Sequence, residues 1–379
     1  MKRSVLALVV MARVASAQEF AGGQLEVEAP YIDLLTFGPG EMLLERFGHA
    51  AICLRYHDPR NQTICFNYGV TSFEDGATAL AWNFLRGTQE FWVEPAPFGT
   101  MFSAYQWEDR DIYRQTLPLA PVEARRIEDA LWDSQDGRNR FYVYDHLFDN
   151  CATRLRDLID RATGGKLAAH GDAPYPLTYR DLAIRGLAGE PDLVVLMDFA
   201  MGRAADVTPT TWQAMFHPDV LRAEVAARLG AAPELVYRRH GRPFPTDGGT
   251  RHRLPFLLVA LGLAAPLAIV RFAPAARRRR WLERLAIAWA AVPLALVGLV
   301  LWTVAIVSSI PSLRWNELVL VFVPVDAVLP FLGEVRRRRY ARVRVAMIVL
   351  VSLLLAIGVF HQPIWVPLVI AFLPLVLLA

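Results

Sequence analysis

Cysteine, charge and repetition are all scarce in this sequence of 379 residues. Three cysteines are too few for a small disulfide-dense scaffold. Charged residues make up 20% of the chain, below the roughly 25% typical of globular proteins, whereas 54% of the residues are apolar. This composition excludes disordered and collagen-like chains, and no internal repeat is present. What remains is a membrane protein, or a soluble domain joined to one.

The net charge changes sign along the chain. The formal total is +3, yet residues 252–379 contain fourteen arginines and four acidic residues and so carry +10. Residues 18–251 carry −10. An acidic globular part argues against nucleic acid as a partner. The pI near 8.8 therefore comes from the C-terminal part and does not indicate a basic binding surface.

Residues 1–17 have the pattern of a signal peptide. Lys2 and Arg3 precede a short apolar run, and the small residues Ala15-Ser16-Ala17 form a cleavage site. The apolar run is too short to span a bilayer, which disfavours the alternative of an uncleaved anchor. We therefore expect residues 18–237 to form an exported domain.

The rest of the chain divides into a linker and a membrane region. Residues 238–253 are polar and rich in Gly and Pro, as is typical of a linker. Residues 254–379 are expected to form an all-α membrane domain of about five helices. The five apolar segments are Leu254–Val270, Leu285–Val307, Leu318–Leu332, Val345–Phe360 and Ile364–Ala379.

Basic residues alternate between the loops that join these segments. The four loops contain six, one, six and no Arg or Lys in chain order. Because positively charged loops stay in the cytoplasm, residues 18–237 are expected on the periplasmic side of a bacterial inner membrane. The C-terminus is then cytoplasmic, which agrees with the signal peptide.

Cys53 and Cys65 flank a predicted hairpin turn centred on Pro59. In that register the two cysteines lie opposite each other, close to the distance of a disulfide, and the periplasm is oxidising. The alternative is a pair of buried free thiols, because register is uncertain from sequence.

Cys151 follows Asp149 and Asn150, either of which is a good N-cap, and so is expected at the start of a helix. The helix dipole there lowers the pKa of a thiol and favours the nucleophilic thiolate. The alternative is a small buried cysteine with no chemical role.

A nucleophilic cysteine needs a base, and His49 is the candidate. In the hairpin register His49 and Asn67 point to the same face, where the Asn67 amide can hold the imidazole. A cysteine at a helix start, a histidine on a strand and a polar third member form a papain-like arrangement. His146 is interpreted as structural. The remaining histidines lack metal-ligand spacing, so we expect no metal site and no cofactor.

Several short motifs in residues 46–94 and 141–160 resemble the periplasmic domain of the Lnb-type bacterial lipoprotein N-acyltransferases. The matching blocks are Phe47-Gly48-His49, Asn67-Tyr68-Gly69, Trp82-Asn83-Phe84 with Arg86-Gly87, and Asp149-Asn150-Cys151 with Thr153-Arg154. The trailing membrane region, with Trp315-Asn316-Glu317-Leu318, is also similar to that family. The resemblance implies an α+β, permuted papain-like Cys-His domain followed by the membrane bundle.

The resemblance also implies a function. An acyl chain would move from a phospholipid to Cys151 as a thioester, and then to the N-terminal amine of a diacylated lipoprotein, with His49 and Asn67 as the other catalytic residues. Asn150, Asn316 and Asp326 are candidate substrate-binding residues. For Asp326, an intramembrane carboxylate, the alternative is a hydrogen bond between helices.

Three other functions are compatible with the same residues. A peptidoglycan peptidase or amidase uses the same Cys-His pair on the same general fold. A phospholipase differs only in passing the acyl group to water. A membrane scaffold that binds lipoproteins without chemistry would leave the pairing of His49 with Cys151 as a coincidence.

Overall fold

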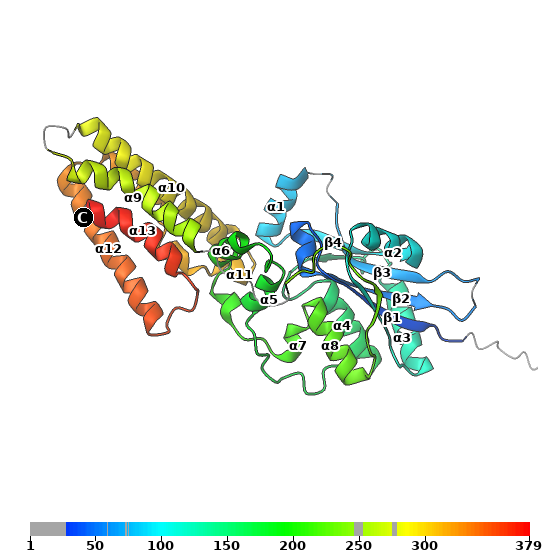
Figure 1. The fold of residues 1–379 in the computed structure, drawn as a ribbon. Helices are drawn as coiled ribbons and strands as arrows, with labels where there is room; N and C mark the ends of the chain where they lie inside the picture. The colour runs from blue at the N-terminus through cyan, green and yellow to red at the C-terminus, as the bar shows by residue number, and fades with distance from the viewer. Residues whose placement is uncertain (1–27, 59, 73, 75, 246–252, 275–278) are drawn as a thin grey trace, which may run out of the picture.

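The computed structural model describes residues 28–379 except 59, 73, 75, 246–252 and 275–278. The predicted signal peptide lies outside the described residues. Figure 1 shows a sheet-containing domain at one end of the molecule and a bundle of helices at the other. The protein is thus a mixed α+β protein, with an antiparallel sheet in its N-terminal part and helices in its C-terminal part.

The N-terminal domain is built on a seven-stranded sheet in the order β6-β4-β3-β2-β1-β5-β7. Among the described residues, all six pairs of neighbouring strands are antiparallel. The strands are β1 (Tyr31–Phe37), β2 (His49–Arg55), β3 (Ile64–Val70), β4 (Glu90–Pro97), β5 (Ile112–Thr116), β6 (Phe141–Val143) and β7 (Glu234–Tyr237). The predicted hairpin is β2–β3, and its register pairs Cys53 with Cys65 as expected.

Helices cover both faces of this sheet. The main core lies between one face and the helices α3 (Pro121–Asp133), α4 (Cys151–Ala162) and α8 (Pro218–Leu229). Helix α4 buries Leu155, Leu158, Ile159 and Ala162, a spacing that places them on one helical face against the strands. A smaller core on the opposite face includes Met101 of α2 (Phe98–Trp107).

Shorter elements complete this domain. They are η1 (Leu43–Phe47), α1 (Gly76–Arg86), α5 (Tyr179–Arg185), α6 (Pro191–Ala200), η2 (Arg203–Asp206) and α7 (Thr211–Ala214).

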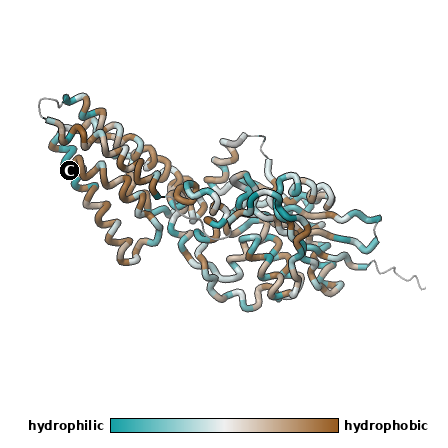
Figure 2. Tube along the Cα trace, in the orientation of Figure 1, coloured by the Kyte–Doolittle hydropathy of each residue, from teal (hydrophilic) through white to brown (hydrophobic). Residues whose placement is uncertain are grey.

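The C-terminal part is apolar over most of its length (Figure 2). It contains α9 (Leu254–Phe272), α10 (Arg280–Val307), α11 (Pro311–Arg314), η4 (Glu317–Leu320), η5 (Pro324–Phe331), α12 (Glu334–Ala356) and α13 (Trp365–Leu378). Within the described part of the chain, two helices, α9 and α10, are long and apolar enough to cross a membrane. The expected bundle of five membrane helices is therefore not established by helix length and composition.

The third predicted membrane segment is not a membrane-length helix. It forms the two 3-10 helices η4 and η5, because Pro324 and Pro330 lack the N–H groups that a continuous α-helix needs. The segment packs along α10, where Gly298 leaves room for the backbone of Phe322. The fourth segment also differs: α12 begins at Glu334, so the arginines expected in a loop lie on its first turns.

The domain and the bundle are joined by direct hydrogen bonds. The Asn316 side-chain amide donates to the backbone carbonyl oxygen of Phe199 at 2.7 Å. The Gln362 side-chain amide donates to the backbone carbonyl oxygen of Met201, also at 2.7 Å. The Ser309 hydroxyl donates to the carbonyl oxygen of Arg86 at 2.7 Å. The sheet domain is therefore held against the bundle end formed by the α10–α11, α11–η4 and α12–α13 connections.

The first part of the predicted linker packs on the sheet domain. The backbone N–H groups of His240 and Gly241 each donate to the Asp109 carboxylate at 2.8 Å. Residues 246–252 of that linker lie outside the described residues.

Candidate functional site

Helix α4 starts at Cys151, and Asn150 is its N-cap. The Asn150 side chain accepts a hydrogen bond from the backbone N–H of Thr153 at 2.9 Å. In return, the Thr153 hydroxyl accepts a hydrogen bond from the backbone N–H of Asn150 at 2.8 Å. The Asn150 amide also donates to the carbonyl oxygens of His146 and Phe216. These contacts fix the first turn of α4 and hence the position of the Cys151 side chain.

The Cys151 sulfur is buried, with 7% of the residue exposed. Backbone N–H groups of Ala50 and Ala152 and the charge of Arg110 lower the pKa of the thiol, but burial outweighs them and raises it to about 11. The N–H groups at the helix start do lower the pKa as expected, but the expected net preference for the thiolate is wrong, because desolvation disfavours the charged form more strongly. Cys151 rests as a thiol, and a base has to take its proton when it reacts.

His49 is the first residue of β2, directly before Ala50, whose N–H faces the Cys151 sulfur. Its Nε2 lies 2.5 Å from the Oδ1 of Asn67 on β3. Because an amide oxygen accepts, Nε2 carries the proton and Nδ1 keeps a free lone pair. Burial, and then the charge of Arg110, lower the pKa of the imidazole to about 4, so that it is neutral at physiological pH.

The three predicted catalytic residues are therefore gathered at one place, where the start of α4 meets the start of β2. Among the described residues no hydrogen bond joins the Cys151 thiol to the His49 imidazole. The neutral thiol beside a neutral, oriented imidazole is an arrangement in which proton transfer accompanies nucleophilic attack.

Tyr142 is the first of two residues near the site that sequence analysis missed. The Tyr142 hydroxyl is one of the few buried polar atoms without a partner in the described structure. Gly69, at a φ of +98°, separates it from the imidazole: a Cβ there would lie 3.7 Å from His49 Cε1 and 3.9 Å from the Tyr142 hydroxyl. Burial, and then the charge of Cys151, hold the pKa of Tyr142 far above its usual value, so it remains a hydrogen-bond donor.

Arg110 is the second residue that sequence analysis missed. It is 3% exposed, its Nε donates to the carbonyl oxygen of Gly38 at 2.9 Å, and its guanidinium lies over the Tyr105 ring at 4.8 Å. The Tyr105 ring in turn stacks on His49 with centroids 5.9 Å apart. This buried cation adds to the larger effect of burial in lowering the pKa of the imidazole, and nothing in its local sequence marks it.

The predicted substrate-binding residues have their polar groups engaged elsewhere. The Asp326 carboxylate pairs with Arg344 at 3.0 Å and accepts from the Tyr340 hydroxyl at 2.7 Å, which corresponds to the interhelical alternative. Asn316 bonds the backbone of α6, and Asn150 is occupied as the N-cap. The structure does not bring Asn316 or Asp326 to Cys151 through any contact among the described residues.

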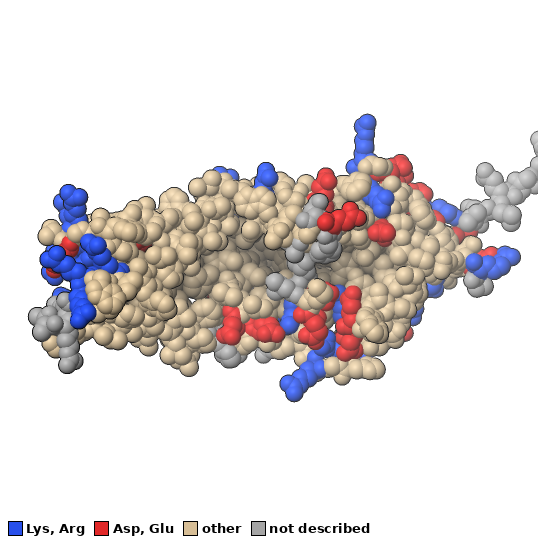
Figure 3. Space-filling model, turned by 90° about the horizontal axis from the view of Figure 1, so that it is seen from above, with Lys and Arg blue, Asp and Glu red and all other residues tan. Residues whose placement is uncertain are grey.

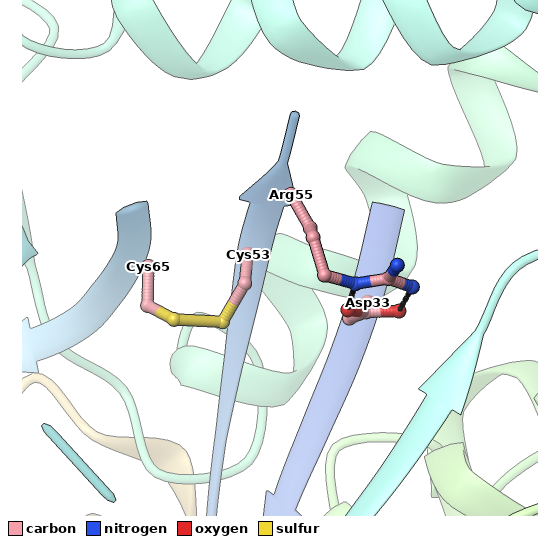
Figure 4. The surroundings of a disulfide bond; sticks show 4 residues. All are labelled: Asp33, Cys53, Arg55 and Cys65. Carbon is pink, nitrogen blue, oxygen red and sulfur yellow. Dashed lines mark hydrogen bonds and ion pairs between the residues drawn. A yellow bond between two sulfur atoms is a disulfide. The ribbon is translucent and has the colours of Figure 1, made fainter. Parts of the chain in front are cut away.

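Cys53 and Cys65 form a disulfide across the β2–β3 hairpin (Figure 4). Beside it, Arg55 donates to Asp33 on the neighbouring strand at 2.8 Å. Cys151 is the free cysteine. The disulfide bond links the two strands that hold His49 and Asn67.

No group of three or more potential metal ligands is found in the described part of the chain.

Asn150→Ala is expected to lower the free energy of unfolding by about 1–2 kcal/mol, because the first turn of α4 loses its cap. It should also impair any reaction that depends on Cys151, since the sulfur loses its fixed position. Thermal unfolding and activity in detergent measure the two effects. Thr178→Ala, which removes the N-cap of α5, is the matched control, and it should lose stability alone. An Asn150→Ala protein as stable as wild type would contradict this assignment.

Comparison with known families agrees with the motif resemblance. Residues 17–185 match the family model described as the Lnb N-terminal periplasmic domain. The matched segment includes His49, Asn67 and Cys151. No curated protein and no solved structure matches the chain. Together with the two membrane-capable helices, the match indicates a membrane protein with a periplasmic domain.

Proposed function

Since residues 17–185 belong to the Lnb N-terminal periplasmic domain family, we propose that the protein is a lipoprotein N-acyltransferase. It moves an acyl chain from a phospholipid, through a thioester on Cys151, to the N-terminal amine of a diacylated lipoprotein. The observation that carries the proposal is the buried Cys151 thiol at the backbone N–H of Ala50, next in the chain to His49, whose imidazole Asn67 orients. The domain is a permuted papain-like fold, in which the histidine strand precedes the cysteine helix in the chain.

In the first half-reaction, Cys151 attacks the carbonyl carbon of a phospholipid ester while His49 Nδ1 takes the thiol proton. The tetrahedral oxyanion accepts a hydrogen bond from the Tyr142 hydroxyl, whose raised pKa keeps it protonated. The ester C–O bond then breaks, and the leaving lysophospholipid oxygen receives the proton from His49. Cys151 is left as an acyl thioester.

In the second half-reaction, the neutral amine of the acceptor attacks the thioester carbonyl. A proton passes from the attacking nitrogen to His49 and then to the departing sulfur as the C–S bond breaks. The products are an amide on the lipoprotein and the free Cys151 thiol. Because the two substrates react in turn, the kinetics are ping-pong.

The charge distribution of the bundle supports a membrane setting for this chemistry. Lys and Arg side chains gather at the end of the bundle that lies away from the sheet domain (Figure 3). Arg337 pairs with Glu283 there, and Arg342 donates to the carbonyl oxygen of the C-terminal Ala379 at 3.2 Å. We propose that this basic end and the C-terminus are cytoplasmic and that Leu318–Leu332 crosses the membrane between α10 and α12 as the third of five passes.

At membrane depth, the backbone N–H and C=O groups of an irregular segment need hydrogen-bond partners inside the protein. Arg344 of α12 supplies them by donating to the carbonyl oxygens of Leu320 and Val321, which the 3-10 geometry leaves available. Asp326 balances the charge of Arg344. The ion pair thus supports a third pass that is not a regular helix.

Tyr142→Phe is expected to lower kcat for acyl transfer about 100-fold, because it removes one donor to the oxyanion and leaves the ring in place. KM for the phospholipid should stay within a few-fold of wild type. Tyr144→Phe, on the same approach to α4, is the matched control. A Tyr142→Phe protein with wild-type kcat would show that the unpartnered hydroxyl has no role in the reaction.

The function itself is tested by incubating the detergent-purified full chain with phospholipid carrying a labelled acyl chain and a synthetic diacylated lipopeptide. The proposal predicts label on the N-terminal amine of the lipopeptide and one lysophospholipid for each transfer. Release of free labelled fatty acid with no lipopeptide product would indicate a phospholipase instead. Cleavage of peptidoglycan fragments, with the lipids untouched, would replace the proposal by a peptidase.

A further inference from the structure

One face of the sheet leads from the candidate catalytic residues to an exposed carboxylate. His49 bonds Asn67, and Asn67 lies directly opposite Glu94 of β4 in the antiparallel register. Residues paired in this way point to the same face with Cβ atoms about 5 Å apart. Glu94 is exposed, and the Trp92 indole N–H on the same strand donates to its carboxylate at 3.3 Å. Glu94 is thus an oriented anion next to Asn67.

A cavity of about 380 Å³ continues this face beyond Trp92. Trp92 forms part of its wall, together with Leu80 and Asn83 of α1 and Phe141 and Val143 of β6. Its volume is sufficient for a few residues of an extended peptide.

The cavity lies close to the membrane bundle. Gly87, which follows α1 and lines the cavity, approaches the bundle so closely that a Cβ there would meet the Ser309 hydroxyl and Ile310. Ser309 also donates to the carbonyl oxygen of Arg86 at 2.7 Å. In the proposed orientation, a substrate anchored in the outer leaflet would lie close to this cavity.

The negative charge around the cavity favours the lipoprotein acceptor over the phospholipid donor. Glu90 lines the cavity, Glu94 stands between it and Asn67, and none of the described lining residues is Lys or Arg. Carboxylates repel the phosphate of a phospholipid donor but attract an ammonium group. The acceptor carries an α-ammonium group, whereas phosphate-bearing headgroups are disfavoured here.

Resting on the acyltransferase function above, we propose that this face is the acceptor subsite. Glu94 binds the α-ammonium of the N-terminal residue, and the cavity beside Trp92 holds the peptide that follows it. Glu94 takes one proton from the ammonium and passes it to solvent, which leaves the neutral amine to attack the Cys151 thioester. The N–C bond forms, the C–S bond breaks, and the second proton goes through His49 to the sulfur.

Glu94→Gln tests the subsite in the full-length protein, with the two half-reactions measured separately. The variant should form the phospholipid-derived thioester at the wild-type rate. Its KM for the diacylated lipopeptide should rise about 10-fold, since a charge-assisted hydrogen bond is replaced by a neutral one. Hydroxylamine, a small neutral nucleophile that needs no ammonium subsite, should discharge the variant's thioester as fast as the wild type's. Glu94→Asp should recover part of the lost affinity.

Glu234→Gln is the matched control, because Glu234 is an exposed glutamate on β7 at the opposite edge of the same sheet. It should leave both half-reactions unchanged. Equal lipopeptide KM values for wild type, Glu94→Gln and Glu234→Gln would overturn the subsite while leaving the acyltransferase function standing. Slow thioester formation in Glu94→Gln would also overturn it, because Glu94 would then serve the donor step. Absence of any thioester in wild type would instead contradict the proposed function.

Discussion

Cys151→Ala is expected to lower acyl transfer by at least about 10³-fold, because it removes the nucleophile on which the acyl chain is held as a thioester. The sulfur is buried at the first turn of a capped helix, so the smaller methyl group is tolerated there with little loss of packing. Transfer of labelled acyl chain to a diacylated lipopeptide measures the effect.

The control for this variant is its own stability. Thermal unfolding in the same detergent should stay within a few degrees of wild type, since the Asn150 cap and the apolar face of α4 are intact. A Cys151→Ala protein that is well folded and retains activity within 10-fold of wild type would refute a nucleophilic role for Cys151.

His49→Gln is expected to lower kcat by about 10³-fold, because the Cys151 thiol, with a pKa near 11, loses the base that takes its proton. Glutamine keeps a polar side chain facing Asn67. The matched control is His146→Gln, which removes another buried imidazole from the approach to α4 and should leave kcat within a few-fold. Equal losses in the two variants would show that His49 acts through packing alone.

The pH profile gives an independent readout of the same residue. Burial lowers the pKa of His49 to about 4, and the imidazole is a base only above its pKa. The acidic limb of kcat/KM should therefore fall at about pH 4, well below the 6.5 of an unperturbed histidine. An acidic limb near pH 6.5 would mean that the imidazole is solvated in the working enzyme.

The local parts of the site follow from the sequence. The hairpin turn sets the register of Cys53 against Cys65, and the same register places Asn67 within reach of His49. The N-cap residue Asn150 marks the start of α4 and so the place of Cys151. Each of these features depends on residues that are near one another in the chain or paired in one hairpin, which is why short patterns predict them.

The remaining parts depend on contacts that short patterns do not encode. Tyr142 lies on a strand of three residues at the sheet edge, and Arg110 reaches His49 through the Tyr105 ring. The pKa of Cys151 rises because tertiary burial outweighs the helix dipole, which local sequence alone suggested would dominate. Tertiary packing against α10 similarly supports a 3-10 segment where hydropathy predicted a regular helix.

The central claim, an acyl chain held on Cys151, is tested most directly by the intact mass of the detergent-purified protein after incubation with mixed phospholipids. The account predicts a mass increase equal to one fatty acyl group, removed by hydroxylamine and absent from the Cys151→Ala variant. An unchanged mass in protein that nonetheless acylates a lipopeptide, or an adduct that persists in Cys151→Ala, would contradict it.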